Sequence, residues 1–432
     1  MTSLERTRTV KCKRVPLSTL KPGAVLMASI EDPMNRRVKL LTEGSQVTQE
    51  FIDRLRARRI DSVILSQRDI AVMNAFMPQG RRRNVPPAHA YVTSHDRNDY
   101  SEATDAFVKS ADLSIPPIET PLVAEAGKSD DKTYSDELKL AWSRESNTQI
   151  AAVEEFFDDT MSTGGPDVTP LKETCEALLR RIQEDQDAFV CMSSTPYDSD
   201  YPSRHGIHMT GISLTIGVEM GLDHSHLMDL GLGCLIHDVG MKAVGLPMFD
   251  TKTTLSQSQL KRLSDHPVKA IEIAGSYGEV SERAKLVAYQ IHERLDGSGY
   301  PRGHSAKEID PLAKIAAVAD SFVGMLANRK HRLAIQGYFV MTKLLDEVKH
   351  RKLDPQVVRA LIRATSLYPL GSYVLLDNDC IGRVTRSGRD DYTLPTIEMW
   401  HKDHLNNEPA VVNLKEDSSI NIVESMPAPR AA

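Results

Sequence analysis

The sequence predicts a mainly α-helical protein, in which a helical bundle is flanked by a small N-terminal β/α domain and a short C-terminal β subdomain. From residue 135 to about residue 365, apolar side chains recur at helical spacing with few breaks. Short apolar runs separated by turn residues stand before and after this region, and they favour strands. At roughly 150 residues per domain, a chain of 432 residues suffices for about three such units.

These patterns divide the chain into four segments. We expect residues 1–77 to form the β/α module, 78–132 a polar linker, 133–365 the helical domain and 366–432 a β-hairpin appendage. In the first segment, the apolar runs predict strands over 24–30, 38–41 and 60–65. Thr48 is placed to cap a helix in which Phe51 and Leu55 share one face.

The second and fourth segments are rich in turn residues. The linker contains a triple arginine at 81–83 and proline pairs at 86–87 and 116–117, without a sustained apolar period, so we expect it to be flexible and at most partly ordered. The arginines are better explained as a solvated charge run than as a phosphate site. Beyond Pro369, apolar runs at 373–376, 381–384 and 396–400 have the spacing of hairpins.

Composition excludes several classes of protein. With 53 Lys and Arg against 59 Asp and Glu, the net charge of −6 favours neither nucleic acid nor membrane as a partner. Five cysteines stand singly, so neither a disulfide framework nor a cysteine-rich zinc site is indicated. No apolar run approaches the roughly 18 residues of a membrane span. We expect a soluble, cytoplasmic protein.

Metal-ligand residues lie on the predicted apolar helices. Met209 and Ile212 follow His205 at helical spacing, which puts this histidine on a buried stripe. A lone histidine there is more often a core residue than a ligand. The next helix ends in His237 and Asp238, and the aspartate falls on an apolar face, where a carboxylate has to be paired, hydrogen-bonded or metal-bound.

Three further residues complete the candidate set. Asp320 is the only carboxylate in the apolar stretch from 315 to 326, and His266 and His292 stand at element boundaries. Imidazole and carboxylate without thiolate suit iron, manganese or nickel at least as well as zinc. Two such metals about 3.5–4 Å apart, bridged by a carboxylate, drive in-line displacement at phosphorus.

In this order and spacing, the residues from about 151 to 369 resemble the HD-GYP family, the HD-superfamily phosphodiesterases that act on cyclic di-GMP. The resemblance implies an HD-superfamily helical bundle and a bacterial signalling enzyme with two divalent metals, iron or manganese. It implies that His205, His237, Asp238 and Asp320 hold one metal and that the catalytic Asp238 bridges to a second metal held by His266 and His292.

The resemblance also implies substrate contacts. Arg329 and Arg332 would grip phosphates of cyclic di-GMP. Gly299, Tyr300 and Pro301 form the signature loop of the family, which contacts substrate and partners, diguanylate cyclase domains among them; the same sequence is equally consistent with a rigid turn.

This chain departs from the family pattern at several positions. Ile291 replaces the first of two adjacent histidines, so the second metal loses a ligand. If the second metal position is lost, the site holds one metal. Met241 replaces a lysine that contacts the scissile phosphate. Lys242 is rotated from that position by about 100°. Tyr201 replaces an acidic residue, so we expect two metals at most. The remaining histidines considered as substitutes are better explained as surface residues: His208, His224, His226, His304 and His331.

Three functions follow from these observations. The first is a phosphodiesterase that opens cyclic di-GMP to pGpG and continues to GMP. The second is a weakly active or inactive relative that binds cyclic di-GMP or a partner as a sensor or scaffold, because Ile291 and Met241 remove functional groups. The third is an HD-superfamily phosphohydrolase for another nucleotide.

Overall fold

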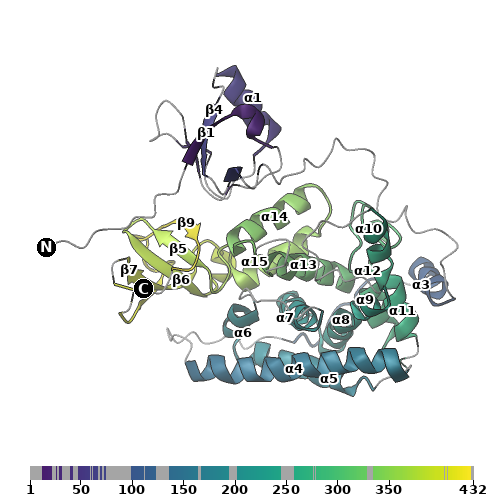
Figure 1. Cartoon of the computed structure of the whole chain (residues 1–432). Coiled ribbons are helices and arrows are strands. Elements are labelled where there is room, and N and C mark those ends of the chain that lie inside the picture. The colour runs from purple at the N-terminus through teal and green to yellow at the C-terminus, as the bar shows by residue number, and fades with distance from the viewer. Residues whose placement is uncertain are drawn as a thin grey trace. The chain divides into compact units, whose positions relative to one another are not determined.

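Figure 1 shows the fold of the protein in a computed structural model. The chain divides into two compact units, Met1–Val85 and Pro86–Ala432. The structure describes residues 12–21, 26, 29–31, 39–41, 47–58, 60, 62–66, 69–70, 73, 99–110, 112–122, 136–163, 167–193, 202–244, 257–275, 277, 279–327, 334–402, 404–405 and 407–429.

In the part that the structure describes, the N-terminal unit contains a small sheet and helix α1. Its elements are β1 (Cys12–Pro16), the short 3-10 helix η1 (Leu17–Thr19), β2 (Ile30–Glu31), β3 (Lys39–Leu41), α1 (Gln49–Ala57) and β4 (Ser62–Ser66), and the sheet has the order β1-β4-β2-β3. The Thr48 hydroxyl accepts a hydrogen bond from the Phe51 amide at 3.0 Å, as its predicted role as a cap requires. Strand β1 was not predicted, and most of 24–30 lies outside the described residues.

The second unit is mainly helical, which confirms the predicted fold class. Its long helices are α4 (Asp136–Thr163), α5 (Thr169–Glu184), α7 (Ser203–Glu219), α8 (His224–Ile236), α13 (Pro311–Leu326), α14 (Gly337–Lys349) and α15 (Pro355–Thr365). Shorter helices are α6 (Gln186–Ser193), α9 (Val239–Val244), α10 (Gln257–Ser264), α11 (His266–Ala274) and α12 (Glu282–Gln290). Helix α7 packs against α8, α13 and α15, and α4 and α5 lie along the opposite side of the bundle from α13 and α14 (Figure 1).

The helices that carry the site begin at caps that the sequence supplies. Ser281 accepts from the Ala284 amide at 3.0 Å at the start of α12. Asp310 accepts from the Leu312 amide at 2.7 Å at the start of α13, where Pro311 fits the first turn. Each cap contributes about 1 kcal/mol and fixes where the helix begins, and therefore which face its polar residues occupy.

Part of the segment predicted as a linker is folded onto the helical unit. Residues Asp99–Ser110 form helix α3, whose Val108 is buried in the same hydrophobic cluster as parts of α11 and α12. Downstream, the Leu113 carbonyl accepts from the Arg283 guanidinium at 3.1 Å, and the Leu122 amide donates to the Leu222 carbonyl at 2.9 Å. These described residues show the partial order that the sequence analysis allowed for this segment, because a few apolar side chains suffice for docking on a surface that is already formed.

The C-terminal strands are also part of the helical unit. Strands β5 (Tyr373–Leu376), β6 (Cys380–Arg386), β7 (Thr396–His401), β8 (Ala410–Asn413) and β9 (Ile422–Met426), with the 3-10 helix η4 (Arg389–Asp391), form an antiparallel sheet of order β8-β7-β6-β5-β9. The sequence predicted β5 to β7 and missed the two edge strands. Arg386 pairs with Asp185 at 2.5 Å, and the Ser387 hydroxyl donates to Asp187 at 2.9 Å, which joins the sheet to the start of α6.

Candidate metal centre

Six predicted ligands meet inside the helical unit. They come from α7, the end of α8, the turn before α9, the start of α11, the loop after α12, and α13, in the order His205, His237, Asp238, His266, His292 and Asp320. Ligand atoms of His205, His237 and Asp238 lie within 4.8 Å of one another, and so do those of Asp238, His266 and His292. The two triads therefore share Asp238.

Asp320 faces both triads from α13. Its Oδ1 lies 3.1 Å from Nε2 of His205, and its Oδ2 lies 3.6 Å from Nδ1 of His292. Asp320 thus connects a histidine of the first triad with a histidine of the second. The burial of this carboxylate alone would raise its pKa, but the bond from His205 and the nearby imidazoles outweigh burial and hold the pKa well below its ordinary value.

Backbone carbonyls fix the orientation of two imidazoles. Nδ1 of His237 donates to the Cys234 carbonyl, and Nδ1 of His266 donates to the Leu263 carbonyl, each at 2.7 Å. A carbonyl oxygen only accepts, so in each neutral ring the proton sits on Nδ1 and the Nε2 lone pair faces the centre. This arrangement is typical of metal-ligating histidines.

The environment of Asp238 fits a cation. Its side chain is 2% exposed, and among the described residues its Oδ2 accepts no hydrogen bond, although Nε2 of His237 lies 3.2 Å away. A lone pair and a carboxylate oxygen at that separation repel unless a proton or a metal ion lies between them. Burial would lower the pKa of His237, but Asp238 and Asp320 outweigh it and raise the pKa to about 9. A bound metal ion would take the place of that proton.

The other ionisable groups are in the states that metal binding needs. Burial lowers the pKa of His266 and of His292, so both rings are neutral at pH 7 and their lone pairs are available. Burial opposes ionisation of Asp238, but His237 and His266 outweigh it and keep its pKa well below the ordinary value. The residues present therefore fit one or two divalent ions.

Gly240 brings the two halves of the centre together. It lies in α9, where a Cβ atom would collide with the backbone of His266 and Ala270 in α11. Only glycine allows α9 and α11 to approach this closely. The approach sets Asp238, two residues earlier, within 3.7 Å of Nε2 of His266.

The predicted signature loop packs directly on the second triad. The Tyr300 ring stacks on the His292 ring with centroids 4.8 Å apart, and the Tyr300 amide donates to the His292 carbonyl at 3.2 Å. A side chain at Gly299 would collide with the backbone of Glu293 and Arg294. The loop thus has the close packing of a rigid turn and also contacts a candidate ligand.

Glu293 has a role that the sequence analysis missed. Its buried carboxylate accepts hydrogen bonds from three successive amides, those of Arg302, Gly303 and His304, at 2.8, 3.1 and 3.0 Å. Burial is the main cause that raises its pKa to about 7, and the three amide bonds oppose that rise. The carboxylate holds the end of the loop against the residue next to His292.

The structure locates the departures from the family pattern. Ile291 is 0% exposed and belongs to the main hydrophobic core, and Met241 is buried. The Lys242 ammonium forms an ion pair with Asp158 of α4 and lies 5.9 Å from the centre of the Phe157 ring. Lys242 is therefore engaged by α4.

The other predicted residues lie elsewhere or outside the described ranges. His224 pairs with Glu176, His226 with Asp223, and His304 accepts from Gln290, so none of these adds a ligand to the two triads. His208, His226 and His304 are half-buried rather than on the surface. Nδ1 of His208 donates to the Ser193 carbonyl at 2.8 Å. Outside the described residues lie Tyr201, Arg329, His331 and Arg332.

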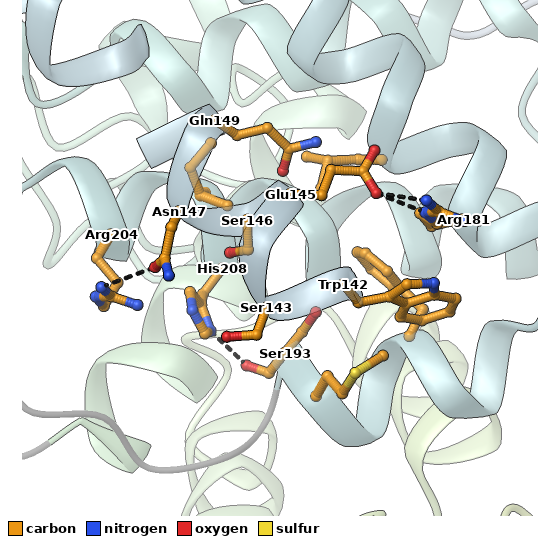
Figure 2. Close-up of a pocket in the computed structure, with 14 residues that line it drawn as sticks. Trp142, Ser143, Glu145, Ser146, Asn147, Gln149, Arg181, Ser193, Arg204 and His208 are labelled. Atoms are coloured by element: carbon orange, nitrogen blue, oxygen red, sulfur yellow. Dashed lines mark hydrogen bonds and ion pairs between the residues drawn. The ribbon is translucent and has the colours of Figure 1, made fainter. Parts of the chain in front are cut away.

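A separate cavity of about 360 Å³ lies between α4, α5, α6 and α7. Figure 2 shows Glu145 paired with Arg181 on one side, and Arg204 with Asn147 and His208 with Ser193 on the other. None of the six candidate ligands lines it. The cavity is therefore distinct from the metal centre.

Comparison with known proteins identifies the class. Residues 174–357 match the HD domain family, a span that contains all six candidate ligands. The chain is 23% identical over 250 residues to the cyclic di-GMP phosphodiesterase PA4108 of Pseudomonas aeruginosa, covering 58% of this chain and 60% of that protein. It is 22% identical to the cyclic di-GMP phosphodiesterase PdeB of Borreliella burgdorferi, covering 51% and 57%. It is 26% identical to the 3'3'-cGAMP-specific phosphodiesterase 3 of Vibrio cholerae, covering 40% and 37%.

The helical unit thus matches the HD domain family over residues 174–357, which agrees with the resemblance that the sequence predicted. It spans about 60% of the length of the first of these relatives and 57% of the second. Among the residues that the structure describes, no helix has both the length and the apolar character needed to cross a membrane.

Proposed function

We propose that this protein is a metal-dependent phosphodiesterase that hydrolyses cyclic di-GMP to pGpG, with GMP as the product of a second cleavage. One observation carries the proposal: two buried triads of ligand atoms share Asp238. A shared carboxylate is the feature that holds two divalent ions at the separation used for phosphodiester hydrolysis. The nitrogen and oxygen donor set, without thiolate, favours iron or manganese.

The residues of the centre have distinct roles in this proposal. When bound, divalent ions stabilise charge on the phosphate and lower the pKa of a water molecule. Asp238 holds the two positions together, while His237 and His266 present fixed lone pairs because their Nδ1 atoms donate to backbone carbonyls. Asp320 orients His205 and His292 toward the same centre.

The names of the similar proteins support cyclic di-GMP as the proposed substrate, since two of the three described above are named for it. The third is named for 3'3'-cGAMP, which makes other cyclic dinucleotides the natural comparison in any assay. Arg329 and Arg332 are proposed to bind the phosphates. Gly299, Tyr300 and Pro301 are proposed to form one wall of the substrate site, because the Tyr300 ring covers His292.

The test is anaerobic turnover by the full chain with iron and manganese quantified, and with products separated by chromatography. Asp238→Asn should abolish formation of pGpG, and Asp158→Asn, the same substitution at an exposed carboxylate, should not. If cyclic di-GMP remains intact after hours of incubation with protein that holds two metals per chain, the proposal that the protein is an active phosphodiesterase is refuted. If 3'3'-cGAMP is cleaved faster than cyclic di-GMP, then 3'3'-cGAMP becomes the proposed substrate.

The second candidate is a sensor or scaffold that binds cyclic di-GMP or a partner with little or no turnover. It is favoured by the burial of Ile291 and Met241 and by the engagement of Lys242 with Asp158, which leave the centre without a histidine and a lysine that the family uses. Isothermal titration with cyclic di-GMP in the metal-free and metal-loaded states decides whether binding occurs without product.

A protein partner is proposed at the loop formed by Gly299, Tyr300 and Pro301. Diguanylate cyclase domains are the expected class, with Tyr300 as the contact. Capture of a purified diguanylate cyclase domain should fall when Tyr300 is changed to Ala. Equal capture by the variant would count against this contact.

A further inference from the structure

Helix α3 presents a charged face to the loop that carries His292 of the second triad. Asp105 and Lys109 are four residues apart and share one side of the helix, while Val108 is buried in the hydrophobic cluster beneath it. Lys109 acts electrostatically on His304 and Glu308, which lie at the end of the same loop. The helix therefore docks by an apolar contact and places its charges over residues 302–308.

Asp105 makes two hydrogen bonds that no sequence motif predicts. Its Oδ1 accepts from the Tyr289 hydroxyl at 3.0 Å, and its Oδ2 accepts from Nε of Arg302 at 2.8 Å. The side chains of Arg302 and Asp105 are only 9% and 14% exposed. The Arg302 guanidinium also lies 5.7 Å from the centre of the Tyr289 ring. Removing one partner of such a shielded ion pair is costly, because it leaves the other charge in a poorly solvated place.

The contact continues to a candidate metal ligand. The Arg302 amide donates to Oε1 of Glu293 at 2.8 Å, and Glu293 directly follows His292 in the chain. Two residues before Arg302, the Tyr300 amide donates to the His292 carbonyl, and the Tyr300 ring covers the His292 ring. The loop from 292 to 304 is thus held on one side by Glu293 and on the other by Asp105.

The histidines of the first triad are placed differently. His205 belongs to α7 and His237 directly follows α8, and both helices are packed in the main core. The contacts of α3 thus reach the centre first at His292, and the first triad lies one contact further on, through Asp320 and the shared Asp238.

We propose that Asp105 is a positioning residue: through Arg302 it holds the loop 292–304 so that His292 faces the second metal position, and undocking of α3 releases the metal at that position first. This inference rests on the metal centre of the proposed function. Because α3 lies in the segment that joins the N-terminal unit to the helical unit, it gives that segment control over the number of metals held.

Hydrogen exchange of the loop amides tests the proposal directly. The amides of Tyr300, Arg302, Gly303 and His304 are all hydrogen-bonded in the docked loop. In the full-length Asp105→Ala variant, they should exchange at least about tenfold faster, as expected for the loss of a charged hydrogen bond. Asp112→Asn is the matched control, since Asp112 lies in the same segment and its exposed carboxylate accepts from the Ser114 amide within that segment.

Metal counting gives the second readout. Dialysis against a fixed manganese and chelator buffer should leave the wild type with one more metal per chain than Asp105→Ala. Asp105→Asn, which keeps an acceptor for Tyr289, should lie between them. Arg302→Met keeps the backbone amide that donates to Glu293. If Asp105 acts on the loop through its ion pair with Arg302, adding Arg302→Met to Asp105→Ala should change the metal count and the loop exchange little further.

Two outcomes would overturn the proposal. One is unchanged exchange at 299–304 in Asp105→Ala, with faster exchange confined to α3. The other is a lower melting temperature with the same loop exchange and the same metal count, which would make Asp105 a purely structural residue. Neither readout needs turnover. If Asp105→Ala shows the faster loop exchange and the lower metal count while the wild type hydrolyses no cyclic dinucleotide, the proposed function is refuted and this inference stands.

Discussion

The Nε2 atoms of His266 and His292 lie 3.0 Å apart, in a place where burial lowers the pKa of both rings. Because Nδ1 of His266 donates to the Leu263 carbonyl, its Nε2 presents a lone pair to His292. The two nitrogens converge as ligands of one ion would, and Asp238 completes that triad.

This relationship predicts how metals are lost. His292→Asn should remove one metal per chain, because only the second triad contains His292, whereas Asp238→Asn should remove both. The measurement is metal content by mass spectrometry after dialysis against one chelator buffer. His224→Asn, at an exposed histidine paired with Glu176, is the control. Equal losses in His292→Asn and Asp238→Asn would contradict the shared carboxylate.

Lys242 should be dispensable for turnover. Its ammonium is held by Asp158 and by the Phe157 ring, so Lys242→Met should change kcat/KM by less than about twofold and cost at most about 1 kcal/mol of stability. Asp158→Asn should have the same small effects. A loss of tenfold or more in kcat/KM for Lys242→Met alone would mean that the lysine reaches the substrate during the reaction.

Restoring a histidine at Ile291 should have opposite effects with and without metal. In the metal-free protein, Ile291→His puts a polar ring into a fully buried site and should cost about 1–3 kcal/mol. Added manganese should recover more stability in this variant than in the wild type if the new imidazole ligates. Ile291→Leu, a volume-conserving change, should cost less than about 1.5 kcal/mol and show the wild-type metal response. An identical manganese response in Ile291→His would show that the ring does not reach the metal.

Gly240→Ala should damage both stability and the second metal position. The added Cβ meets the backbone of α11 at His266 and Ala270, so the helices have to separate, at a cost of about 1–3 kcal/mol or more. Gly206→Ala is the matched control: this helical glycine has open space around the Cβ position, and alanine there should be neutral or stabilising by up to about 1 kcal/mol. Thermal unfolding and metal content of the two variants make the comparison.

Stability at mildly acidic pH should depend on His208. Burial lowers the pKa of this ring from 6.5 to about 4. The unfolded chain therefore binds the proton first, so stability is full above about pH 6.5 and falls as pH drops toward 4. Between pH 7 and 5 the wild type should lose about 1–2 kcal/mol more than His208→Asn in metal-free urea unfolding. His350→Asn, at an exposed histidine, should keep the wild-type pH dependence; parallel curves for wild type and His208→Asn would contradict the assignment.

The candidate ligands could be picked out from the sequence because they break a pattern. Asp320 is a carboxylate within an apolar run, and His205 sits on an apolar stripe, so a buried polar partner had to exist. The convergence of the two triads on Asp238 was expected only through the family resemblance, since residues on different helices meet by packing and not by spacing.

The supports of the site were not predictable in the same way. Glu293 binds amides nine to eleven residues later, an arrangement set by the path of the loop and not by a local period. Asp105 lies in a polar stretch with one buried apolar contact at Val108, too weak a pattern to predict a docked helix. Strands β8 and β9 are short edge strands whose pairing depends on the sheet already formed by β5 to β7.

The distance along the chain between His205 and Asp320, 115 residues, has a consequence for how the protein is made. Contacts of such sequence separation carry a loop-closure cost, so we expect the helices to dock before the candidate ligands converge, unlike in a short zinc finger. We therefore expect metal loading to follow folding, so that the ion acquired reflects the supply present when the bundle closes. Expression in manganese-rich or iron-rich medium should yield different occupants of the same fold.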